Sequence, residues 1–169
     1  MKAIRVMAFI ALIGLVLGIV MIGDALAGEK GKVVERFAWF ASSFPSAKVA
    51  DVEGHAIVLL EAKGILFNEK WGAAIVDQSG TCDFIKGAGP HEGYDVTTFP
   101  DGSTIVDRYK GSARGGGAGT TKSASGEGTW SYVKGTGKFE GIQGGGTYKY
   151  WVLGPGRWYT EREGEYTIP

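Results

Sequence analysis

The chain has 169 residues, with 18 basic and 18 acidic side chains and a formal net charge of zero. Without a basic block it lacks the electrostatic signature of proteins that bind nucleic acid or an anionic membrane surface, so neither is an expected partner. Its one cysteine, Cys82, cannot form an internal disulfide, so packing must stabilise the fold. We expect this thiol to be buried and inert.

The first 27 residues are typical of a secretory signal peptide. Lys2 and Arg5 give a short positive start, an uncharged apolar run follows at residues 6–22, and the small-residue pattern Ala25-Leu26-Ala27 comes next. These three parts predict cleavage before Gly28 and an extracytoplasmic location, periplasmic or secreted. An uncleaved membrane anchor is the alternative, because the apolar run is at the lower limit of the length that spans a bilayer.

Residues 28–169 predict one all-β domain, without membrane contact after signal cleavage. Glycine makes up 29 of the 169 residues, well above the ordinary level of about 7%. Helices tolerate this poorly, whereas the aromatic and β-branched residues between the glycines favour strands. We expect about eight strands, drawn from the runs 33–40, 56–67, 71–76, 82–85, 94–99, 103–109, 129–133, 147–153 and 157–168.

Turn residues separate several of these runs. Pro100-Asp101-Gly102 predicts a hairpin turn, because proline presets φ and glycine supplies the left-handed residue. Gly154-Pro155-Gly156 predicts the turn between the last two strands, and Asp77-Gln78-Ser79-Gly80 predicts a turn after residue 76. Residues 112–128 contain no large apolar side chain and predict a long loop or an exposed edge hairpin.

Four units place an aromatic residue two positions after a glycine. Because positions i and i+2 share one face of a strand, an aromatic on one strand can cover a glycine on its neighbour and set the register. We expect a curved meander that closes into a small antiparallel barrel, with the last strand paired to an early one. A two-sheet sandwich is the alternative. The units are Gly128-Thr129-Trp130, Gly146-Thr147-Tyr148, Gly156-Arg157-Trp158 and Gly164-Glu165-Tyr166.

The segment Gly135-Thr-Gly-Lys-Phe-Glu-Gly141, with the glycine-containing run that follows to Tyr148, resembles the late-strand motif of the allene oxide cyclase and dirigent barrel superfamily. The hairpin from Gly93 to Gly111 is similar to that of bacterial members of unassigned role. The resemblance covers about Gly54 to Tyr150. It implies a barrel that cyclises a fatty-acid epoxide or steers phenol coupling, often as a homotrimer. The catalytic residues of neither activity can be placed here, which counts against both.

Known catalytic, cofactor and metal motifs are missing from the sequence. The glycine-rich segment before Lys122 lacks the glycine, the strand and the helix of a phosphate-binding loop. The chain has two histidines, His55 and His91, and no spacing of metal ligands. We therefore expect no metal and no cofactor, and we assign no catalytic residue.

Three polar residues are candidates for contacts with a ligand. His55 and Glu61 share one face of a strand and could point into the barrel as a base and a ligand anchor. In the other arrangement they lie outside, with the small residues Ala56 to Gly64 at even positions inside, and no charge is buried. Arg108 alternates with Asp107, so one of the two faces inward, and an inward arginine could anchor an acidic ligand.

Five aromatic residues lie on the glycine-bearing faces and would line a pocket or fill a dry core. A pocket would suit a small apolar or phenolic ligand, and ligand binding is our leading hypothesis. An isomerase or cyclase acting on such a ligand is an alternative, and a structural envelope protein with a solid core is another. The five residues are Trp130, Tyr132, Tyr148, Tyr150 and Trp158.

Overall fold

The computed structural model describes residues 28–115 and 124–169. The predicted signal peptide lies outside the described residues, as do residues 116–123. Among the described residues, no helix is long and apolar enough to cross a membrane. The elements are β1 (Glu29–Ser43), β2 (Ser46–Lys48), β3 (His55–Asn68), β4 (Gly72–Ile85), β5 (Gly89–Thr98), β6 (Thr104–Arg114), β7 (Ser125–Gly135), the short 3-10 helix η2 (Gly137–Phe139), β8 (Gln143–Gly154) and β9 (Arg157–Ile168).

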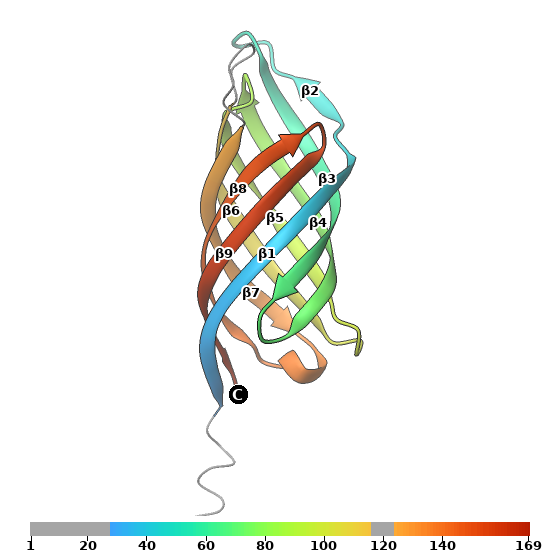
Figure 1. The fold of residues 1–169 in the computed structure, drawn as a ribbon. Coiled ribbons are helices and arrows are strands. Elements are labelled where there is room, and N and C mark those ends of the chain that lie inside the picture. Colours follow the sequence, from blue (N-terminus) through green and yellow to red (C-terminus); the bar gives the residue numbers. More distant parts are fainter. Residues whose placement is uncertain (1–27, 116–123) are drawn as a thin grey trace, which may run out of the picture.

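Eight of the strands form a closed antiparallel barrel, which confirms the barrel and excludes the sandwich (Figure 1). Strand β1 closes it, because it pairs with β9 along one edge and with β3 along the other. The last strand therefore pairs with an early one, as expected, beginning at Glu29 opposite Ile168. The ninth strand, β2, adds to the outer end of β3.

One predicted break is wrong. The run Asp77 to Gly80 is no turn, because β4 passes through it and pairs with β3 without interruption. The side chains of this run alternate between the two faces of the strand. Asp77 forms an ion pair with Lys63 on the outer face, whereas Gln78 points into the barrel. For residues 112–128, the hairpin alternative is the one that the structure supports: β6 continues to Arg114, β7 begins at Ser125, and the two strands pair. Because the barrel is closed, this hairpin does not lie at a sheet edge.

The other two predicted turns are present. Gly102 follows Pro100-Asp101 with a φ of +82°, and Gly156 follows Gly154-Pro155 with a φ of +63°, values that L side chains rarely adopt. The Asp101 carboxylate also accepts a hydrogen bond of 3.0 Å from the Ser103 amide, which stabilises the β5–β6 turn.

Aromatic side chains cover glycines on neighbouring strands, as the glycine–aromatic units predict. Tyr148 on β8 is paired with Gly128 on β7, and Trp130 on β7 is paired with Gly146 on β8. The same relationship joins Trp39 on β1 to Gly64 on β3. A side chain at Gly128 or Gly64 would collide with the ring across from it, so these two contacts fix the register.

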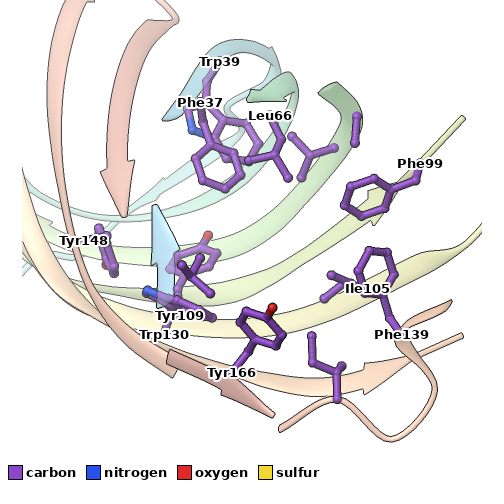
Figure 2. Packing of buried hydrophobic residues seen from close by; sticks show 14 of the residues in the cluster. Phe37, Trp39, Leu66, Phe99, Ile105, Tyr109, Trp130, Phe139, Tyr148 and Tyr166 are labelled. Atoms are coloured by element: carbon purple, nitrogen blue, oxygen red, sulfur yellow. The ribbon is translucent and has the colours of Figure 1, made fainter. Parts of the chain in front are cut away.

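The inside of the barrel has three layers along its axis. The end near the C-terminus is closed by packed aromatic rings, of which Trp71 lies 4.9 Å from Phe139 and 4.8 Å from Tyr166 between ring centroids. Figure 2 shows Phe99, Ile105 and Phe139 together in this region. A cluster of charged side chains fills the middle layer, and a cavity occupies the opposite end.

Candidate functional site

A cavity of about 160 Å³ lies inside the barrel, at the end where the β8–β9 and β4–β5 turns lie. Its walls are mainly aromatic or aliphatic, and its polar lining comes from a few side chains. The apolar and aromatic lining consists of Trp39, Phe44, Leu60, Phe84, Tyr109, Tyr148, Tyr150, Val152 and Trp158. The polar lining consists of Gln78, Cys82, His91, Asp95, Thr160 and Arg162.

One wall is held rigid by stacked indoles. Trp39 on β1 and Trp158 on β9 are paired across the strands, with ring centroids 5.9 Å apart and planes 15° from parallel. The Trp39 indole nitrogen donates a hydrogen bond of 3.1 Å to the Thr160 hydroxyl. This bond satisfies a buried donor and fixes the orientation of the ring.

Another part of the lining carries His91 on β5 and Tyr148 on β8. The His91 Nε2 atom lies 2.6 Å from the Tyr148 hydroxyl oxygen, and the other ring nitrogen, Nδ1, is buried with no hydrogen-bond partner. Burial lowers the pKa of His91 to about 4, so the imidazole is neutral at pH 7. The neutral ring therefore keeps one buried nitrogen without a hydrogen-bond partner.

Arg162 and three carboxyl groups form a buried cluster directly below the cavity. The guanidinium lies 2.8 Å from Asp95, 3.0 Å from Asp107 and 3.7 Å from Glu35. All four side chains are at most 4% exposed, and they come from β9, β5, β6 and β1. This set is called the ion cluster below.

Amide side chains and aromatic rings complete the ion cluster. Gln78 donates a hydrogen bond of 2.9 Å to Asp95, and Asn68 donates one of 3.0 Å to Glu35. The Arg162 guanidinium also lies between two aromatic faces, 4.6 Å from the Phe37 ring centroid and 4.7 Å from that of Trp130. Cation–π attraction and ion pairing thus act on the same group.

The cluster contains more acidic groups than one guanidinium can neutralise. Burial, reinforced by the neighbouring Asp107 carboxyl, raises the pKa of Asp95 to about 7. Burial also raises the pKa values of Glu35 and Asp107 above those of free carboxyls. The cluster therefore retains protons near neutral pH, and Asp95 is the carboxyl that borders the cavity.

The aromatic candidates divide between the cavity and the solid core. Tyr148, Tyr150 and Trp158 line the cavity. Trp130 is buried deeper, beside Arg162, and Tyr132 packs against it with ring centroids 4.8 Å apart. The pocket and the dry core are thus both present, in different layers of one barrel.

The polar candidates His55, Glu61 and Arg108 all lie away from the cavity. Glu61 is exposed on the outer face of β3, and the even positions of that strand face inward. Arg108 is also exposed and pairs with Glu92 at 2.9 Å, because its neighbour on β6, Asp107, is the inward residue. Residues other than these three therefore supply the polar lining of the cavity.

His55 connects a loop to the end of β4. Its Nδ1 atom lies 2.5 Å from Asp51, and its Nε2 atom lies 2.6 Å from Asp83. These hydrogen bonds, the one to Asp51 foremost, raise the pKa of His55. Its role in the structure is to hold the loop before β3.

Cys82 is buried at the cavity, as expected, and burial raises its pKa to about 11. A thiol with so high a pKa is a poor nucleophile at neutral pH.

Sequence reasoning missed the ion cluster. One signal was available: on β6, Asp107 shares its face with Ile105 and Tyr109, so a carboxylate lies on an otherwise apolar face. An acidic residue in such a place requires a buried partner. The sequence does not show that this partner is Arg162.

Comparison of the chain with protein-family models, with curated proteins and with solved structures gives no match. Within the described residues, no group of three or more His, Cys, Asp or Glu side chains is arranged to hold a metal ion.

Proposed function

We propose that this protein is an exported barrel that binds a small apolar or phenolic molecule in its cavity. The observation that carries the proposal is a cavity with aromatic walls above a polar floor. Such a combination of apolar walls and few polar groups is typical of ligand sites. In a structural protein with a solid core, we would expect side chains to fill this space.

The size of the cavity favours a ligand with a single ring. Its 160 Å³ is below the roughly 300–1,000 Å³ of pockets for drug-sized molecules. Apolar cavities of about 150 Å³ are known to take up benzene. A single ring with a short substituent therefore fits, whereas the full chain of a fatty acid does not.

An isomerase or cyclase is the second candidate, and Asp95 is the observation that favours it. A carboxyl group with a pKa of about 7 beside an apolar cavity is suited to proton transfer at neutral pH. The barrel is compatible with membership of the allene oxide cyclase and dirigent superfamily, which we propose on the sequence resemblance. Turnover of a bound ligand would separate this candidate from simple binding.

A pair of variants on β3 tests ligand binding. Leu60 lines the cavity, whereas its neighbour Leu59 is exposed on the outer face. Calorimetric titration with 4-ethylphenol should show saturable binding near 1:1 to the wild type and to Leu59→Trp. Leu60→Trp should weaken binding at least about tenfold, because the indole fills the cavity. Absence of saturable binding to the wild type, or equal binding to both variants, would refute the proposal.

A further inference from the structure

At the floor of the cavity, acidic side chains outnumber basic ones. Arg162 is the only basic side chain of the ion cluster, and it faces three carboxyl groups. Its Nη1 atom is close to Asp107 and Glu35, and its Nη2 atom is bonded to Asp95. With two guanidinium nitrogens already engaged, an added anion would meet three acidic groups beside one cation.

Among the residues that the structure describes, the lining of the cavity supplies no second cation. Arg162 and His91 are the basic residues of this described lining, and His91 is neutral at pH 7. The His91 Nδ1 atom is buried and has no hydrogen-bond partner. If the Nε2–H group donates to the Tyr148 oxygen 2.6 Å away, Nδ1 is an acceptor and the neutral ring supplies no positive charge.

The walls of the cavity suit a positive charge. Tryptophan and tyrosine rings attract cations to their faces, and more strongly when the cation is desolvated. The protein already uses this arrangement for its own buried cation, since Arg162 lies between Phe37 and Trp130 and against carboxylates. The cavity presents the same two features, aromatic rings and a carboxyl group, to a molecule that enters it.

We propose that the ligand of this cavity is a small organic amine, bound as its ammonium ion against Asp95 with its apolar body between the aromatic walls. This inference rests on the proposed function, because it concerns the chemical class of the ligand in the same cavity. An ammonium group there donates a hydrogen bond to Asp95. It takes the place of the proton that the raised pKa of Asp95 otherwise holds in the cluster near neutral pH.

Three probes of one shape test the charge of the ligand in the wild-type protein. 2-Phenylethylamine is a cation at neutral pH, 2-phenylethanol is neutral, and 3-phenylpropionate is an anion. Calorimetric titration should show the amine binding at least about tenfold more tightly than the alcohol, and the carboxylate more weakly than both. Equal affinities for amine and alcohol, or tighter binding of the carboxylate, would overturn the inference and leave the proposed function standing. If none of the three binds, both fail.

Two variants on β5 test whether the ammonium group of the ligand binds at Asp95. Asp95→Asn keeps the shape of the side chain and its ability to accept from Gln78, but removes the negative charge. It should lose the preference for amine over alcohol while still binding the alcohol. Glu92→Gln removes an exposed carboxylate from the outer face of the same strand and should leave the preference unchanged. An amine preference that survives in Asp95→Asn would refute the placement of the ammonium group. The comparison of probes in the wild type decides the inference even if this variant fails to fold.

Discussion

Tyr148 lies directly across from Gly128 on the neighbouring strand, and its hydroxyl oxygen would be 2.6 Å from a Cβ atom placed on that glycine. The Tyr148 side chain can occupy this position only because residue 128 is a glycine. Tyr148 in turn lies 2.6 Å from His91 and lines the cavity. The register of β7 and β8, the packing of Tyr148 and the geometry of the cavity therefore all depend on the absence of a side chain at Gly128.

Gly128→Ala should lower the free energy of unfolding by about 1–3 kcal/mol, because the added methyl group collides with Tyr148 and with the carbonyl of Lys110. Gly154→Ala is the matched control, since no atom lies within 4 Å of a Cβ atom built there. Urea denaturation of both variants measures the effect. Similar losses in the two variants would contradict the steric explanation.

Arg162→Met should destabilise the protein strongly, by about 3–5 kcal/mol at pH 8, because three buried carboxyl groups lose their only cation. The loss should shrink at pH 5, where protonation removes the carboxylate charges. Arg157→Met, at an exposed position of the same strand, should have little effect. Thermal or urea unfolding at both pH values tests this, and a loss independent of pH would argue that the cluster is not charged.

The stability of the wild type should itself depend on pH through Asp95. Its pKa is about 7 in the folded protein and near 3.8 in the unfolded chain, so the folded state holds the extra proton between these values. Stability from this group therefore decreases as the pH rises from about 4 to about 7, and then changes no further. Urea unfolding across this range should show a steeper decline in the wild type than in Asp95→Asn. Identical slopes would place the titrating proton elsewhere.

The two histidines should titrate on opposite sides of the ordinary value of 6.5. The pKa of His55 is raised by its bonds to Asp51 and Asp83, and the pKa of His91 is lowered to about 4 by burial. The contribution of His55 to stability is thus complete below pH 6.5 and is lost as the pH rises through its folded pKa. Proton NMR should resolve two imidazole titrations, and His55→Gln should remove the one at higher pH. Two titrations near 6.5 would show that both rings are solvated.

The sequence by itself determined much of the local structure. The hairpin turns at Gly102 and Gly156 follow from the residues that favour turns. The pairing of the last strand with an early one follows from the need to close a sheet edge. The glycine–aromatic spacing also predicted that aromatic residues lie across from glycines on neighbouring strands, as they do on β7 and β8. These features depend on residues close in the sequence or on the period of a strand.

Only the tertiary structure decided which polar residues reach the cavity. Alternation separates the two faces of a strand, but hydrophobicity does not say here which one is internal. Ile65 and Ile75 lie exposed on the outer face, while Asp95 and Arg162 are buried inside. The charged residues can occupy the interior because closure brings β1, β5, β6 and β9 around one guanidinium, where each carboxyl group finds a partner. Asp95 and Arg162 are 67 positions apart, and no local pattern in the sequence records that they meet.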